Sequence, residues 1–135
     1  MTASQQPSDS RLRVLIVEDI DINRDLLVQL LEENHDLAVA ADGEEGLRLA
    51  TEWQPDVILL DLSLPKLDGW SVAQALRDLP TRARMVVVAL TAHAMTGDEA
   101  QALASGCDAY IAKPVDEAHL FDLLADVARS REHRT

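Results

Sequence analysis

Five short apolar runs alternate with segments of helical periodicity, and this alternation constrains the fold more than any other feature of the chain. The runs cover residues 12–17, 35–40, 56–60, 85–90 and 109–112, with 35–40 the weakest. The other four are continuous rather than alternating, which is typical of strands that have both faces covered. The pattern therefore predicts an α/β fold, a doubly wound, five-stranded parallel sheet with helices on both faces.

Two intervening segments carry apolar residues at the spacing of one buried helix face. These residues are Ile22, Leu26, Leu27, Leu30 and Leu31 in the first segment, and Leu120, Phe121, Leu124, Val127 and Ala128 in the second. Pairs with the spacing of a helix-capping box, Asp42 with Glu45 and Thr96 with Glu99, predict two further helix starts.

The chain of 135 residues is the usual size of one domain, and its 47% hydrophobic content is that of a soluble globular protein. Its formal net charge of -12 argues against nucleic acid as a direct partner, since such binding depends on lysine and arginine. No apolar stretch of about 20 residues is present to cross a membrane, and residues 1–10 lack the layout of a signal peptide. We therefore expect a cytoplasmic protein. The single cysteine, Cys107, excludes an internal disulfide and is expected to be buried.

Polar side chains follow four of the predicted strands at the point where each strand ends. They are Glu18 and Asp19, then Asp61, Thr91 and Lys113. In a parallel sheet these positions converge on one edge, where ligands of open α/β folds bind. Singly, each has an ordinary structural explanation: Asp19 as a helix cap, Thr91 as a turn residue, Lys113 as a solvated charge.

Together, these five residues predict a chemical site. Three converging carboxylates repel one another and call for a cation, and oxygen ligands without histidine or cysteine favour Mg²⁺. A carboxylate beside Mg²⁺, a lysine and a hydroxyl is also what phosphoryl transfer requires, with aspartate able to act as the nucleophile.

Four motifs give the chain a more specific resemblance. They are Val17-Glu18-Asp19, the segment 61–69 (DLSLPKLDG), the segment 89–92 (ALTA) and the segment 110–114 (YIAKP). In this order and spacing, over residues 12–129, they resemble the receiver domain of bacterial response regulators. Asn23 and Arg24 add to the likeness, which is greatest to single-domain phosphorelay regulators.

The resemblance implies a flavodoxin-like (βα)5 fold with strand order 2-1-3-4-5, and a role for each motif residue. Asp61 would accept the phosphoryl group, and Mg²⁺ would be held by Glu18, Asp19, Asp61 and the carbonyl of Ser63. Thr91, Ala92 and Lys113 would contact the phosphoryl group. Thr91 and Tyr110 would switch the face formed by the fourth helix, last strand and last helix, and the Lys113–Pro114 bond would be cis.

The resemblance also implies a signalling domain rather than an enzyme, one that assists its own phosphorylation and dephosphorylation. The phosphoryl donor would be a sensor histidine kinase or a histidine phosphotransfer protein, and the receiver could form a homodimer. Residues 11–130 would form the domain, between tails at 1–10 and 131–135. A receiver module of a hybrid histidine kinase would have much the same sequence, so that alternative stays open.

Two other classes of protein share part of this pattern. Asp19 and Asp21 follow a strand with the spacing that opens haloacid dehalogenase-type phosphatases, but that family has a later acidic pair at a strand end, and nothing after Lys113 looks like one. Asp21 is therefore expected to be solvated or to cap a helix. The second alternative, an interaction module without phosphorylation, usually loses an acid or the lysine, whereas this chain keeps the full set.

Overall fold

The computed structural model describes residues 11–62, 69–91 and 106–132. In this part of the chain, five parallel strands form one sheet in the order β2-β1-β3-β4-β5. The strands are β1 (Arg13–Val17), β2 (Asp36–Ala40), β3 (Val57–Asp61), β4 (Val86–Thr91) and β5 (Ala109–Ala112). The helices are α1 (Asp21–Leu31), α2 (Gly43–Trp53), α3 (Gly69–Arg77) and α5 (Glu117–Glu132), with a short 3-10 helix, η2 (Arg82–Arg84). The predicted fold class and strand order are confirmed.

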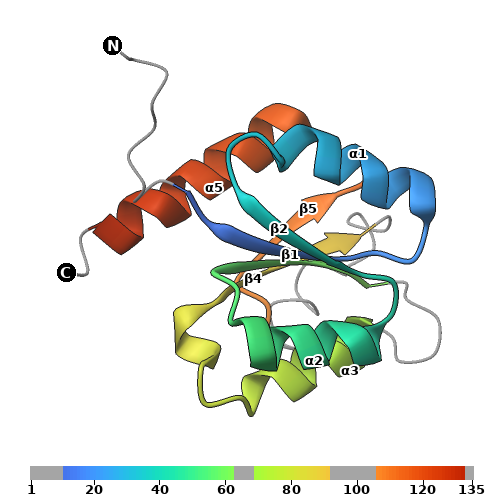
Figure 1. Ribbon diagram of the computed structural model, residues 1–135, viewed down its shortest axis with the longest axis vertical. Coiled ribbons are helices and arrows are strands. Elements are labelled where there is room, and N and C mark those ends of the chain that lie inside the picture. The colour runs from blue at the N-terminus through green and yellow to red at the C-terminus, as the bar shows by residue number, and fades with distance from the viewer. Residues whose placement is uncertain (1–10, 63–68, 92–105, 133–135) are drawn as a thin grey trace.

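Helices cover both faces of the sheet, with α1 and α5 on one side and α2 and α3 on the other (Figure 1). All five residues of the central strand β3 are buried. Val57 and Leu59 pack toward α1 and α5, whereas Ile58 and Leu60 pack toward α2 and α3, as the two-residue period of a strand requires. Each such side chain contributes about 1.5–3 kcal/mol by burial, which explains why the strands read as continuous apolar runs.

The predicted buried face of α1 is only partly correct. Leu27 and Leu31 are buried and Leu30 is half-buried, but Ile22 is 73% exposed and Leu26 is 53% exposed. Apolar residues at spacings of three and four occupy two neighbouring stripes of a helix, and the sheet covers only one of them. The other stripe leaves an apolar surface on α1.

The predicted face of α5 holds except at Phe121, which is 42% exposed. Leu120, Leu124, Val127 and Ala128 pack against the sheet as expected. Leu120 points at the sheet, and the next residue along a helix points about 100° away from it, which leaves Phe121 at the margin of the covered face. The helix itself continues to Glu132, two residues past the domain boundary expected at residue 130.

Local signals in the sequence also appear in the structure. Asp42 caps α2 by accepting a hydrogen bond from the Glu45 amide at 2.9 Å. The Glu45 side chain reaches back to the Ala41 amide rather than to that of Asp42. Cys107 is buried, and burial raises the pKa of its thiol to about 11. The pair Thr96 and Glu99 lies outside the described residues.

No helix in the described part of the chain combines the length and the apolar composition needed to span a membrane.

Candidate functional site

The carboxyl ends of β1, β3, β4 and β5 meet at one edge of the sheet and bring the predicted polar residues together. Asp61 is the last residue of β3 and pairs in register with Leu90 of β4, and Thr91 follows in β4. Glu18 and Lys113 come directly after β1 and β5. Glu18, Asp61 and Thr91 are almost fully buried, with 0%, 1% and 2% of their surface exposed. Polar side chains that are buried at the ends of strands mark a functional site, whereas polar residues that only close a strand are exposed to solvent.

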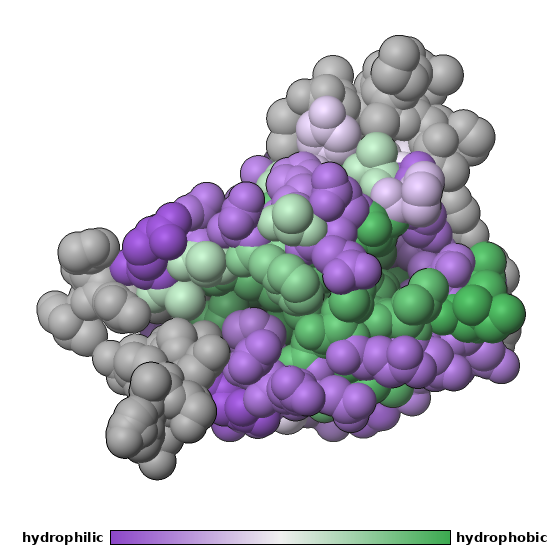
Figure 2. Space-filling view, turned by 90° about the horizontal axis from the view of Figure 1, so that it is seen from above, coloured by the Kyte–Doolittle hydropathy of each residue, from purple (hydrophilic) through white to green (hydrophobic). Residues whose placement is uncertain are grey.

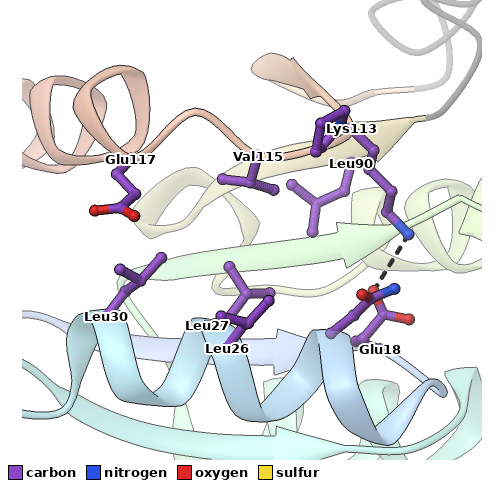
Figure 3. Close-up of a pocket in the computed structure, with 10 residues that line it drawn as sticks. Glu18, Leu26, Leu27, Leu30, Leu90, Lys113, Val115 and Glu117 are labelled. Carbon is purple, nitrogen blue, oxygen red and sulfur yellow. Dashed lines mark hydrogen bonds and ion pairs between the residues drawn. The ribbon is translucent and has the colours of Figure 1, made fainter.

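Lys113 bridges two of the carboxylates. Its Nζ lies 3.2 Å from Oε1 of Glu18 and 3.2 Å from Oδ1 of Asp61. Figure 3 shows the lysine reaching from β5 toward Glu18. Burial alone would lower the pKa of Lys113, but the charges of Asp61 and Glu18 outweigh it and hold the pKa above its ordinary value. The lysine is therefore a fixed positive charge beside Asp61.

Asp19 completes a group of three acids, which we call the acidic cluster (Glu18, Asp19 and Asp61). One carboxylate oxygen from each lies within 4.8 Å of the others. Burial, followed by the hydrogen bond with Asp61, raises the pKa of Glu18. One lysine cannot balance three carboxylates, so a divalent cation would complete the charge. Oxygens on opposite sides of Mg²⁺ lie about 4 Å apart, so the donor set fits this ion after small side-chain movements.

The loop between β1 and α1 presents Glu18 and Asp19. The Glu18 amide donates to the Ala40 carbonyl at 3.0 Å, which ties the loop to β2. The Ile20 amide donates to Oε2 of Glu18 at 3.2 Å, which orients that carboxylate. On the face of the sheet that α2 covers, a Cβ on Gly46 would lie 3.0 Å from Cγ2 of Val17. Glycine at this position therefore lets α2 pack closely against the end of β1.

Arg24, noted in the sequence only for its place in the family likeness, also holds this loop. Its Nη1 donates to the Glu18 carbonyl at 3.1 Å, and its Nη2 pairs with the Asp21 carboxylate. Asp21 is the exposed first residue of α1, with Ile20 at the cap position. Of the two expectations for Asp21, a solvated residue is confirmed and a helix cap is not.

The remaining predicted site residues are Tyr110, Pro114, Ser63 and Ala92. Tyr110 is half-buried on β5 and pairs in register with Ala89. The Lys113–Pro114 peptide bond is cis. Ser63 and Ala92 lie outside the described residues.

A groove of about 440 Å³ opens beside the acidic cluster, between α1 and the segment that joins β5 to α5. Leu26, Leu27 and Leu30 of α1 face Val115 and Glu117 across it, and Glu18 and Lys113 close one end (Figure 3). Figure 2 shows a hydrophobic band on this side of the molecule, where α1 and α5 lie. The exposed apolar residues next to the acidic loop are Ile20, Ile22 and Leu26, which we call the α1 patch.

Comparison with known proteins decides between the classes that the sequence left open. The sequence profile of the response regulator receiver domain matches residues 14–125, most of the chain. The chain belongs to this family. It is therefore a receiver domain of two-component response regulators, a phosphoacceptor signalling domain rather than a typical enzyme.

Two curated relatives differ in size. The response regulator PleD of Caulobacter vibrioides is 38% identical over 118 residues, which are 87% of this chain but 26% of PleD. The chain thus spans about a quarter of that relative. The polar-differentiation response regulator DivK of Brucella anthropi is 41% identical over 103 residues, 76% of this chain and 84% of DivK.

Solved structures resemble this receiver domain closely. The receiver domain of the sensor histidine kinase PA1611 from Pseudomonas aeruginosa, with magnesium coordinated in its active site cleft, has a TM-score of 0.81 at 32% identity, covering 88% of this chain and 98% of that one. The Saccharomyces cerevisiae co-crystal structure of the phosphotransfer protein Ypd1 with the receiver domain of Ssk1 gives 0.83 at 30% identity, covering 90% and 91%.

Proposed function

We propose that this receiver accepts a phosphoryl group on Asp61 from a histidine kinase or histidine phosphotransfer protein, in a reaction that depends on Mg²⁺. The observation that carries the proposal is the acidic cluster with Lys113 bonded to two of its members, Glu18 and Asp61. The likeness to a magnesium-bound receiver and to a receiver crystallised with a phosphotransfer protein supports the choice of ion and donor.

Asp61 is the nucleophile in this proposal. One of its carboxylate oxygens attacks phosphorus, the P–N bond of the donor phosphohistidine breaks, and an acyl phosphate forms on Asp61 as histidine leaves. Lys113, whose Nζ already contacts the Asp61 carboxylate, then pairs with an oxygen of the phosphoryl group on Asp61. The Thr91 hydroxyl and the Ala92 amide are assigned to the other phosphoryl oxygens.

Glu18, Asp19, Asp61 and the Ser63 carbonyl are assigned to hold the metal. Bound Mg²⁺ would supply neutralisation of the charge on the phosphoryl oxygens. The same residues position water for later loss of the phosphoryl group, so the domain assists both its phosphorylation and its dephosphorylation.

The output of the proposed reaction is a switch at the β5 and α5 surface, together with the fourth helix, whose start the pair Thr96 and Glu99 predicts. Thr91 is buried at the end of β4, and its carbonyl accepts from the Lys113 amide at 2.8 Å, so a shift of Thr91 is coupled to β5. Tyr110 lies on β5 and would move inward. Self-association through the altered face would then give a homodimer. NMR amide signals of β5 and α5, compared with and without acetyl phosphate, should shift if the switch occurs.

The likeness to DivK favours a stand-alone regulator, and that to the PA1611 receiver favours a module of a hybrid kinase. Asp61 has the same role in both. A cytoplasmic location is part of the proposal, because ATP, from which a histidine kinase is phosphorylated, is found there; cell fractionation checks it.

The direct test is intact mass of the protein after incubation with acetyl phosphate. With Mg²⁺ we expect the gain of one phosphoryl group, and without Mg²⁺ we expect none. A parallel assay with an aryl phosphate should give no repeated turnover, which separates a receiver from a phosphatase. Labelling that ignores Mg²⁺, or no labelling at all, would contradict the proposal.

The α1 patch is proposed as the surface that the protein donor contacts. It is apolar, it adjoins the acidic loop, and it continues into the groove that ends at Glu18 and Lys113. A donor helix packed there would bring its phosphohistidine to Asp61 and would bury Ile22 and Leu26, which the fold leaves exposed.

The double variant Ile22→Ala, Leu26→Ala is expected to slow transfer from a phosphorylated phosphotransfer protein that labels the wild type by about 10-fold or more, because it removes buried apolar contacts. Labelling by acetyl phosphate should persist, since that donor is too small to need the patch. The control is Phe121→Ala, an apolar residue on α5 that is also exposed, at 42% against 73% for Ile22 and 53% for Leu26. Equal slowing by both variants would contradict the assignment.

A further inference from the structure

Arg24 connects the two ends of the loop that carries the first two members of the acidic cluster. Its guanidinium donates to the Glu18 carbonyl at 3.1 Å and also pairs with the Asp21 carboxylate. Asp19 lies between these two attachment points. The Arg24 side chain is only 20% exposed. Its backbone amide also donates to the Ile20 carbonyl at 2.9 Å, at the start of α1. The loop is thus fastened from within the first turns of the helix.

Local helix energetics do not explain an arginine at this place. The amino-terminal end of a helix carries partial positive charge, so a cation in the first turns is unfavourable. The ion pair with Asp21 offsets little of this, because 81% of the Asp21 side chain is exposed and exposed ion pairs are weak in water. The remaining contact of the guanidinium is the partly buried hydrogen bond to the Glu18 carbonyl.

We propose that Arg24 is a positioning residue for the metal site, holding Glu18 and Asp19 at the spacing from Asp61 that a divalent cation requires. This inference rests on the proposed function, in which the acidic cluster binds Mg²⁺. The planar guanidinium offers several N–H groups in a fixed fork and so spans two acceptors at once, whereas the ammonium of lysine is a point charge on a flexible stem.

A positioning role for Arg24 and simple electrostatics predict opposite changes in Mg²⁺ affinity when Arg24 is replaced. The chain already carries a formal net charge of -12, and removing a positive charge next to three carboxylates should by Coulomb's law strengthen Mg²⁺ binding. If Arg24 instead positions the ligands, its loss weakens Mg²⁺ binding, as is usual for groups that orient metal ligands.

The test is calorimetric titration of Mg²⁺ into three variants, each first checked for a cooperative thermal transition without metal. We expect Arg24→Gln and Arg24→Lys both to bind Mg²⁺ about 10-fold or more weakly than the wild type. The control, Arg48→Gln, removes the same charge from an exposed site on α2 and should bind as the wild type does. In the acetyl phosphate assay, the half-saturating Mg²⁺ concentration of the Arg24 variants should rise by the same factor, with the rate at saturating Mg²⁺ close to that of the wild type.

Unchanged or tighter Mg²⁺ binding in the Arg24 variants would overturn the inference, and so would full recovery of affinity in Arg24→Lys, because charge alone would then suffice. If Arg24→Gln fails to fold, Arg24→Lys, which keeps the charge and the aliphatic stem, decides. Failure of the wild type to bind Mg²⁺ would instead remove the proposed function and this inference with it.

Discussion

Asp61→Asn is expected to abolish the gain of one phosphoryl group that the wild type shows with acetyl phosphate and Mg²⁺. An amide nitrogen and carbonyl replace the anionic nucleophile, so no acyl phosphate can form at this position. Intact mass of the wild type and the variant, measured side by side, gives the result directly. The loss should be complete within detection, since the proposal assigns no other side chain as acceptor.

The substitution should leave the fold intact, because Asp61 contributes charge to a site that already has an excess of it. A neutral amide keeps the size of the side chain and removes its repulsion with Glu18, whose carboxyl Asp61 contacts. We therefore expect a melting temperature no lower than that of the wild type. Asp25→Asn, an exposed acid on α1, is the matched control and should be labelled normally. Normal labelling of Asp61→Asn would refute the assignment of the acceptor.

Asp19→Ala is expected to reduce phosphoryl uptake at a fixed, low Mg²⁺ concentration by about 100-fold or more, because it removes one of the three carboxylates proposed to hold the ion. Asp19 is half-buried at the edge of the sheet and outside both apolar cores, so the protein should remain folded. Uptake measured across a range of Mg²⁺ concentrations, with circular dichroism for the fold, checks both statements.

The control for Asp19→Ala is Asp25→Ala, which removes the same charge from an exposed position one turn into α1. It should behave as the wild type. An uptake curve for Asp19→Ala that superimposes on the control would mean that Asp19 is not a metal ligand.

The central strands and the acidic cluster could be predicted from the sequence because each depends on one strong rule. β3 is buried at every position, so its residues had to be apolar up to Asp61, and the break in the run marks the strand end. Polar residues at the ends of parallel strands must then lie at one edge. The strand order could not be predicted in this way, because no pattern of apolar residues encodes it, and the correct order came from the family likeness.

The errors fall on helix faces. Ile22, Leu26 and Phe121 have the spacing of buried residues, yet the sheet does not cover them. Periodicity states that a helix has an apolar side but not how wide a stripe the sheet will cover. Arg24 was not assigned a role for a related reason, because its main contact is to a backbone carbonyl, which no side-chain pattern encodes.

The placement of Asp61 on β3 has a consequence for how a signal leaves the site. β3 has strands on both sides and helices on both faces, so its amides should exchange with solvent only when the whole domain opens. The proposed phosphoacceptor is thus carried by a strand whose backbone has little freedom to move. A chemical change there cannot be absorbed by movement of its own strand, and the strain must be relieved in the segments around it, whose opening free energies are smaller.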